Sequence, residues 1–318
     1  MFYDLNVPFE PSSSPQTGNA REKANIASWI SPEDQAKLDA RLDILIHLGY
    51  TIIALNQTIT GVFNPKSHRN ILQGIRPREG IVILRRLTII LTEESEKGSG
   101  LVASNTDALK AYDLIALCPT TPTTFQQACL TYSVASPLTA HVITFDLQAN
   151  QRLPFFMKMS LVRTAMKNGA VFEIRYCTTI KRNSAERSRR NWWINAKEVV
   201  RATGGKGLVF TGGGLDSEVR APKDVENLAI LLGCKQDQAH HSMTSTVKSL
   251  LLRAQTRQTY RAVLSEPQIV AAKSLPIPRP AVPPAKKRPL TENEDDEDDC
   301  DTASKTEKRR KKKKKGAK

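Results

Sequence analysis

Short apolar runs recur along the chain up to residue 211, and polar turns and segments of helical period separate them. We predict seven strands, at residues 2–7, 50–56, 81–91, 113–118, 142–147, 171–176 and 208–211. We predict helices between Ser31 and Gly49 and at residues 106–112, 124–132, 160–168, 185–203, 222–232 and 236–253, the last as one helix or two. Apolar strands that alternate with helices are typical of a parallel sheet that is buried on both faces.

The number of strand–helix units decides between two α/β architectures. Seven or more units in about 260 residues favour a barrel over an open doubly wound sheet. No clear eighth strand follows in the sequence, so we predict an irregular α/β, TIM-like (β/α) barrel at residues 1–265. Residues 10–27 are rich in Ser, Pro, Gly and Asn, and we interpret them as an exposed loop.

The composition changes after residue 265. A Pro-rich stretch is followed by eight acidic residues within 292–301 and by eight consecutive basic residues at 308–315. Such blocks cannot bury a core, so we predict that residues 266–318 form a disordered tail. Two clusters in the tail resemble nuclear localisation signals. They comprise Lys286, Lys287 and Arg288, and then Lys308, Arg309, Arg310, Lys311 and Lys312.

The chain is basic even without this tail. Its formal charge is +15, and residues 1–285 alone contain 34 basic and 23 acidic residues. This balance favours a polyanionic partner, although a merely soluble basic surface is the alternative. No apolar run is long enough to span a membrane, and the N-terminus lacks a signal-peptide pattern. The five cysteines show no C-x-x-C spacing, which indicates neither a zinc site nor a disulfide framework.

Basic residues are dense in a predicted loop at residues 181–190, after the sixth strand. This loop contains Lys181, Arg182, Arg187, Arg189 and Arg190. Enzyme barrels place their chemistry at the carboxyl ends of the strands, where this loop lies. A group of cations without histidine indicates contact with a phosphate backbone rather than catalysis. A solvated loop is the alternative. Arg175 and Lys206 complete the RNA-binding candidates. The two tryptophans that follow, Trp192 and Trp193, could stack on bases, although packing on the barrel is favoured.

Three further features have a structural interpretation, and for the two arginines of the third strand a functional role is equally open. The glycine-rich segments 204–207 and 212–214 flank the seventh strand, but no G-x-x-x-x-G-K-[ST] is present, so turns are favoured over a phosphate cradle. Arg85 and Arg86 lie in an apolar strand, where at least one must be paired or reach solvent. The histidines show no metal-ligand spacing. We therefore expect no metal and no cofactor.

Five runs occur in a characteristic order: LRRLTIIL (84–91), YDLIALCP (112–119), LPFFMKMS (153–160), GAVFEIRY (169–176) and APKDVENLAILLG (221–233). With these runs, residues 1–258 resemble the thirty-kilodalton-class TIM-barrel protein subunit of eukaryotic and archaeal ribonuclease P, which is shared with ribonuclease MRP. Against this family, the loop at residues 8–30 is an insertion. The resemblance implies a barrel of the polymerase-and-histidinol-phosphatase type. Metal-dependent barrels of that type begin with H-x-H after the first strand, where this chain has Asp4 and Asn6.

The resemblance implies a function as well as a fold. It implies a non-catalytic, RNA-binding subunit that supports removal of the 5′ leader from precursor tRNA and the processing of precursor rRNA. The implied partners are ribonuclease P RNA, MRP RNA, precursor tRNA through the particle, a small α/β protein subunit and other particle subunits, with no membrane. The implied location is the nucleus and nucleolus. The alternative is a metal-dependent phosphoesterase with unusual ligands, for which Asp4 and Asn6 alone make a poor site.

Overall fold

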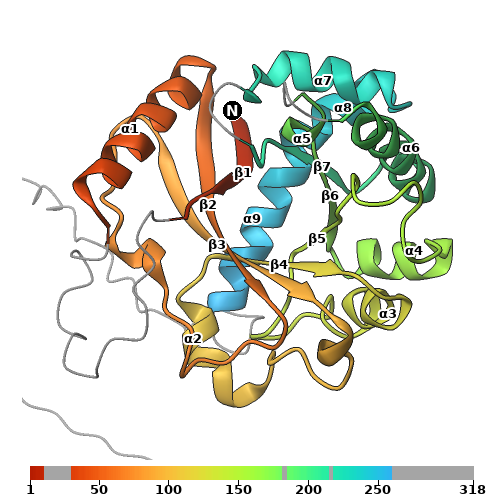
Figure 1. Ribbon diagram of the computed structural model, residues 1–318, viewed down its shortest axis with the longest axis horizontal. Helices are drawn as coiled ribbons and strands as arrows, with labels where there is room; N and C mark the ends of the chain where they lie inside the picture. Colours follow the sequence, from red (N-terminus) through yellow and green to blue (C-terminus); the bar gives the residue numbers. More distant parts are fainter. Residues whose placement is uncertain (11–29, 181–184, 215–217, 260–318) are drawn as a thin grey trace, which may run out of the picture. The chain divides into compact units, whose positions relative to one another are not determined.

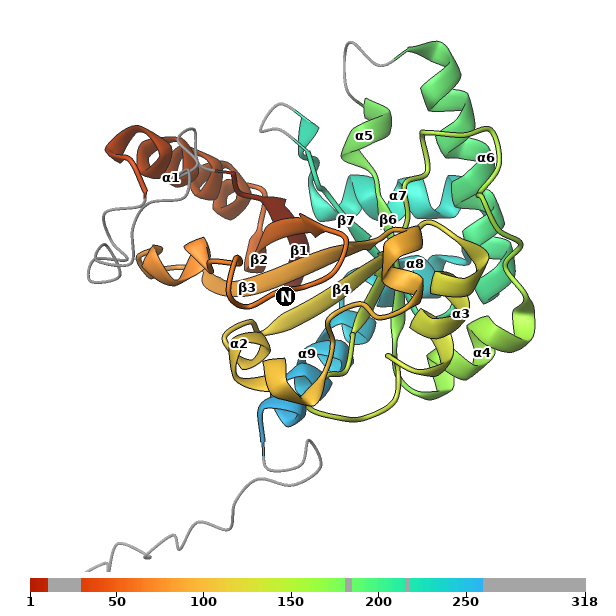
Figure 2. The same cartoon turned by 60° about the horizontal axis from the view of Figure 1, so that its bottom comes forward.

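A computed structural model describes residues 1–10, 30–180, 185–214 and 218–259, all within the compact unit Met1–Gln268. In these residues seven strands form one parallel sheet, in which each strand pairs with its neighbours in chain order (Figures 1 and 2). The strands are β1 (Phe2–Pro8), β2 (Tyr50–Thr60), β3 (Val82–Leu91), β4 (Leu114–Pro119), β5 (Val142–Thr144), β6 (Val171–Arg175) and β7 (Leu208–Thr211).

The helices follow the sequence signals for their ends. Ser31 Oγ accepts the Asp34 N–H at 3.1 Å where α1 begins, and Gly204 ends α6 with a left-handed φ of 64°. The helices are α1 (Pro32–His47), α2 (Thr106–Lys110), α3 (Pro122–Leu130), α4 (Met159–Lys167), α5 (Cys177–Ile180), α6 (Glu186–Thr203), α7 (Pro222–Leu231), α8 (Gln236–Met243) and α9 (Ser245–Gln258). Three 3-10 turns are η3 (Ile71–Gly74), η4 (Glu93–Glu96) and η5 (Ala103–Asn105).

The sheet nearly closes on itself without an eighth strand in the described part of the chain. The Gly213 N–H donates to the Asn6 carbonyl at 2.8 Å, so the segment after β7 bonds directly to β1. The Gly212 N–H reaches both carboxylate oxygens of Asp4 at 3.2 Å. These bonds join the first and last strands, and they confirm the predicted irregular TIM-like barrel.

Helix α9 closes the end of the barrel where the strands begin. Its residues Val247, Leu250 and Ala254 pack in one cluster with early residues of the strands, such as Leu114 and Val171. In Figure 1, α9 crosses the barrel between β1–β3 and β5–β7. Burying an aliphatic side chain of this size contributes about 1.5–3 kcal/mol, so this contact holds the C-terminal helix firmly in place.

Two local features of the strands differ from the sequence pattern. Strict alternation puts Val7 on the face of Tyr3 and Leu5, but a register shift between Asp4 and Val7 turns Val7 into the outer core while the other two face α9. The fifth strand ends at Thr144 rather than residue 147. The apolar residues after Thr144 do not continue the strand. Phe145 instead makes an aromatic contact, with its ring centroid 6.2 Å from that of Phe125.

Candidate functional site

The end of the barrel opposite α9 holds a buried ion pair. Arg86 on β3 donates to both carboxylate oxygens of Glu173 on β6, at 2.5 and 2.6 Å, and neither side chain is exposed. Arg86 Nη1 also donates to the Leu5 carbonyl at 2.8 Å. The bidentate ion pair and this further hydrogen bond replace the hydrogen bonds to water that the guanidinium group loses on burial. The expectation that an arginine of this strand is paired is therefore confirmed at Arg86, while Arg85 is half-buried.

Hydrogen bonds extend this pair across the barrel interior in both directions. The Thr211 hydroxyl donates to Glu173 at 2.8 Å, and Arg86 Nε donates to Thr88 at 3.1 Å. The Thr88 hydroxyl then donates to Asn56 at 2.7 Å, and Asn56 Nδ2 donates to Asn6 at 2.9 Å. We call these residues, with Asp4, the interior network. It connects β1, β2, β3, β6 and β7, so it fixes the strands relative to one another.

Two carboxyl groups of the interior network differ in protonation. Burial would raise the pKa of Glu173, but Arg86 beside it outweighs burial and lowers that pKa, so Glu173 is ionised. Burial raises the pKa of Asp4 to about 6, although the amides of Asn6 and Gly212 partly offset it. Glu173 adds to the rise by repulsion. Asp4 therefore changes charge close to neutral pH.

The residues at the end of the first strand, Asp4 and Asn6, do not fit a divalent cation. Both Asp4 oxygens accept the Gly212 amide, and Asn6 Oδ1 accepts Asn56. Glu173 is committed to Arg86, whose own charge would repel a second cation nearby. Within the described ranges, no three His, Cys, Asp or Glu side chains converge as possible metal ligands. The polar atoms of these side chains are therefore committed to hydrogen bonds within the fold.

The predicted RNA-binding residues fall into three groups. Arg187, Arg189 and Arg190 are exposed, and they lie in the first turns of α6, within the helix predicted at residues 185–203 rather than in the loop predicted at 181–190. Arg175 is half-buried and donates to the Phe145 carbonyl at 3.1 Å. Lys206 is exposed between α6 and β7, at the opposite end of the barrel. Lys181 and Arg182 lie outside the described residues.

The structure supports packing for Trp192 and a turn for the second glycine segment, residues 212–214. Trp192 is fully buried, and its Nε1 donates to the Arg175 carbonyl at 2.8 Å. A Cβ on Gly212 would lie 2.7 Å from Asp4 Oδ2, so this position requires glycine for the close approach of β1. The amides of the second glycine segment bind β1, which confirms its interpretation as a turn.

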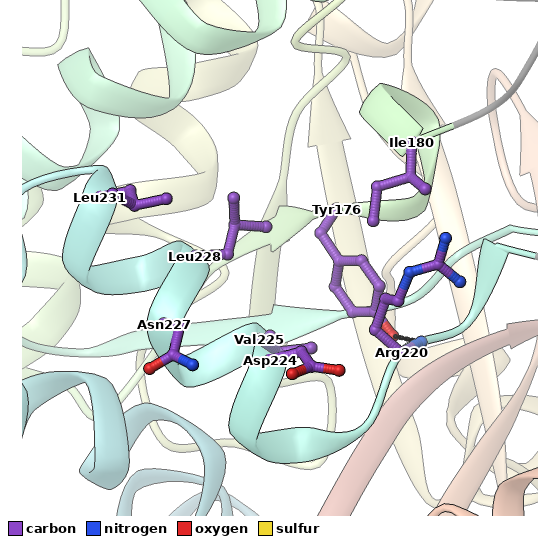
Figure 3. A pocket seen from close by; sticks show the side chains of 8 residues that line it. All are labelled: Tyr176, Ile180, Arg220, Asp224, Val225, Asn227, Leu228 and Leu231. Atoms are coloured by element: carbon purple, nitrogen blue, oxygen red, sulfur yellow. Dashed lines mark hydrogen bonds between the residues drawn. The ribbon is translucent and has the colours of Figure 1, made fainter.

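An apolar groove of about 350 Å³ lies between α5 and α7. Figure 3 shows Tyr176 within it, with Ile180 of α5 on one side and Leu228 and Leu231 of α7 on the other. Leu231 is 68% exposed. The Tyr176 hydroxyl accepts the Arg220 N–H at 3.3 Å, which fixes the tyrosine ring. An exposed leucine beside a preformed groove is typical of a protein contact surface.

A model of the family described as "RNase P subunit p30" matches residues 1–259. The chain belongs to the RNase P subunit p30 family. It is 35% identical over 228 residues to "Probable ribonuclease P protein subunit 3" of Schizosaccharomyces pombe, covering 70% of this chain and 88% of the relative. It is 26% identical over 249 residues to "Ribonuclease P protein subunit p30" of Mus musculus, covering 73% and 86%.

Among solved structures, a chain of the "cryo-EM structure of archaeal Ribonuclease P with mature tRNA" superposes with a TM-score of 0.49 at 11% identity, covering 74% of this chain and 95% of that chain. The family model and the two curated relatives confirm the resemblance to ribonuclease P found in the sequence. They support a role in ribonuclease P and thus in tRNA processing. None of the described helices is long and apolar enough to cross a membrane.

Sequence reasoning missed two features of this p30-family barrel. Glu173 interrupts the apolar run of β6 just as Arg86 interrupts that of β3, so the two charges could have been matched as partners. Asn56 and Thr88 gave a weaker sequence signal for the interior network, since a single Asn or Thr is tolerated in a strand. The groove gave no signal, because α5 is a single turn that no periodicity reveals.

Proposed function

We propose that this p30-family chain is a non-catalytic, RNA-binding protein subunit of nuclear ribonuclease P and of ribonuclease MRP. It supports removal of the 5′ leader from precursor tRNA and the processing of precursor rRNA, while the RNA of each particle carries the catalysis. One observation carries the proposal. Beneath the strand ends where barrel enzymes place their chemistry, the interior of this barrel holds the satisfied Arg86–Glu173 pair, and exposed cations lie outside it on α6.

The exposed arginines at the start of α6 suit this role. Arg187, Arg189 and Arg190 present guanidinium groups that bind phosphate oxygens and displace counterions. Such contacts position an RNA fold and break no bond. Arg175, Lys181, Arg182 and Lys206 remain proposed contacts to the same RNA. The chain would then reach precursor tRNA through the particle.

The remaining partners and the location are part of the same proposal. A small α/β subunit needs an apolar contact surface, and the α5–α7 groove with its exposed Leu231 offers one in the described part of the barrel. Other particle subunits complete the assembly. The basic clusters at Lys286–Arg288 and 308–312 would direct the chain to the nucleus and nucleolus.

Purification of the tagged full chain from cells tests the proposal. We expect it to recover a ribonuclease P RNA and to cleave precursor tRNA, and we expect prior nuclease treatment of the eluate to abolish cleavage. Cleavage by the purified chain alone, dependent on an added divalent metal, would instead establish the phosphoesterase alternative. Absence of both the RNA and the activity would also reject the proposal.

Reversal of the three arginines sharpens this test. We expect Arg187→Glu, Arg189→Glu and Arg190→Glu together to weaken RNA binding. The slope of log affinity against log salt is negative, and we expect its magnitude, here called the salt slope, to fall by about two. The three side chains are exposed, so the circular dichroism spectrum should not change. Lys66→Glu, Lys110→Glu and Lys248→Glu, which also reverse three exposed cations, form the matched control. Equal losses of RNA binding in the two triple variants would mean that the α6 arginines are not part of the RNA interface.

A further inference from the structure

Positive charge is concentrated on one side of the barrel. Residues 146–168 and 185–206 contain ten basic and three acidic residues, and all ten basic side chains are exposed. Residues 30–48, which include α1, contain two basic and four acidic residues. Helix α4 packs beside α6, and both lie across the barrel from α1 (Figures 1 and 2). Exposed cations are therefore dense on the α4 and α6 side of the described barrel.

The outer face of α6 presents its cations in a row. Arg187, Arg190, Lys197 and Arg201 recur at intervals that keep them on one face, opposite the buried Trp192. From the first to the last of these residues the helix rises about 21 Å. The row therefore connects the arginines near the open end of the barrel with Lys206 at the other end. On α4, Arg163 and Lys167 are four residues apart and are also exposed.

The connection between β5 and α4, residues 145–158, is fixed against the same helix. Asn191 Nδ2 donates to the Gln148 carbonyl at 3.1 Å. Asn195 Nδ2 donates to the carbonyls of Leu147 and Asn150, at 3.0 and 2.9 Å. Both asparagines are buried, so they hold this connection beside the first half of α6.

This connection exposes an aromatic ring among cations. Phe156 is 72% exposed, and in the sequence it lies between the exposed Arg152 and Lys158. Its neighbour Phe155 is instead buried and stacks on Phe125, with ring centroids 4.6 Å apart. The buried ring anchors the backbone, which leaves Phe156 projecting. An aromatic ring flanked by cations is the combination that binds unpaired bases together with their phosphates.

We propose that the exposed face of α4, α6 and residues 145–158, here called the α4–α6 surface, binds the ribose-phosphate backbone of a helical RNA segment. Phe156 stacks on an unpaired base at the end of that segment. This inference rests on the proposed function, and it places the RNA along the side of the barrel rather than over its open end. The contact combines recognition of backbone charge with a preference for a junction between paired and unpaired RNA.

The composition of the surface favours RNA over a protein partner. The core of a protein interface is depleted in charged residues, whereas the exposed face of α6 carries four cations, with Glu198 and the exposed Ile194 among them. The cations are distributed over about 21 Å, as a rod-shaped polyanion requires, and do not converge on one acidic side chain. An acidic protein segment is the competing occupant, and the experiment distinguishes it.

The first experiment measures binding of the full chain to a fluorescent RNA hairpin with a single-stranded overhang, by anisotropy at several salt concentrations. The surface variant combines Arg163→Glu, Lys167→Glu and Lys197→Glu. The control combines Lys66→Glu, Lys110→Glu and Lys248→Glu, which makes the same change in net charge on other parts of the barrel. We expect the surface variant to lower the salt slope by about two and the control to lower it by less than one.

The second experiment isolates the ring. We expect Phe156→Ala to weaken binding of the overhang hairpin roughly tenfold, to leave the salt slope unchanged and to leave a blunt hairpin unaffected. Phe156→Trp should restore binding of the overhang hairpin, because it retains a stacking surface. Equal effects on the two hairpins would mean that Phe156 does not contact an unpaired base.

Particle purification separates failure of this inference from failure of the proposed function. If the wild-type chain recovers ribonuclease P RNA but the surface and control variants bind RNA equally, the α4–α6 surface is wrong and the subunit function stands. If RNA binding is unchanged and a protein subunit is lost from the surface variant's particle, the occupant is a protein. If the wild-type chain recovers no such RNA, the proposed function fails first.

Discussion

Two arginine–glutamate pairs in this barrel have similar geometry and opposite surroundings. Arg86 contacts Glu173 through two bonds of 2.5 and 2.6 Å, with both side chains fully buried. Arg201 contacts Glu198 through two bonds of 3.1 and 2.7 Å, with the two side chains 74% and 32% exposed. Both pairs are bidentate, so bond geometry alone does not distinguish them.

Burial separates the roles of these two pairs. Arg86 has lost its hydration and donates hydrogen bonds to Glu173, Leu5 and Thr88. Its charge therefore interacts only within the barrel interior and is inaccessible to a binding partner. Arg201 keeps much of its hydration, and its bond to Glu198 can open at little cost. The comparison indicates that arginine charge inside this barrel stabilises the fold, whereas arginine charge on α6 is available for binding.

Removal of the buried cation should produce the largest effect. In Arg86→Met, Glu173 is left as an uncompensated buried charge, which typically costs 3–5 kcal/mol, so we expect the free energy of unfolding to fall by about that amount. Guanidinium denaturation of the full chain, followed by circular dichroism, measures this loss.

A double variant shows whether the loss comes from the unpaired charge. Arg86→Met combined with Glu173→Leu removes both charges, and we expect it to recover much of the stability that Arg86→Met loses. Losses that simply add in the double variant would mean that the two side chains stabilise the barrel independently.

Asp4 should give the next largest effect, as a dependence on pH. Its pKa is raised from 3.8 to about 6, so the folded state holds the proton more tightly than the unfolded state. The free energy of unfolding contributed by Asp4 is therefore highest below pH 3.8, and it falls as pH rises to about 6. The shift corresponds to a loss of roughly 3 kcal/mol.

Asp4→Asn removes this titration and keeps an oxygen that can accept the Gly212 amide. Relative to wild type, we expect the variant to gain stability between pH 4 and pH 7 and to show a constant difference above that range. Denaturation midpoints measured across the range test this expectation. Parallel stability curves for the two proteins would show that Asp4 does not titrate there.

The sequence predicted much of this architecture because its strands are continuously apolar and its helices carry local end signals. The cost of burying charge also predicted that an arginine of β3 is paired. The partner of Arg86 was harder to predict from the sequence, since Glu173 lies on β6 and contacts Arg86 only when the barrel closes. Register is similarly non-local, which explains why the shift after Asp4 was missed.

The candidate RNA surface was predictable in charge but not in arrangement. The dense cations at 181–190 drew attention to the start of α6, whereas Arg163 and Lys167 are separated from them in sequence and meet them only through helix packing. Phe155 and Phe156 are adjacent and chemically identical, so only packing decides which ring is buried against Phe125 and which is exposed.

The exposed pair provides the smallest expected effect on stability. Arg201→Gln removes a solvated charge whose partner Glu198 can hydrate freely, so we expect no measurable shift in the guanidinium midpoint, in contrast to Arg86→Met. The same change removes one cation from the α6 row, so RNA binding should weaken and the salt slope should fall by less than one. Parallel denaturation and anisotropy measurements on this variant test both halves. A clear loss of stability without a change in RNA binding would reverse the roles assigned to the two arginines.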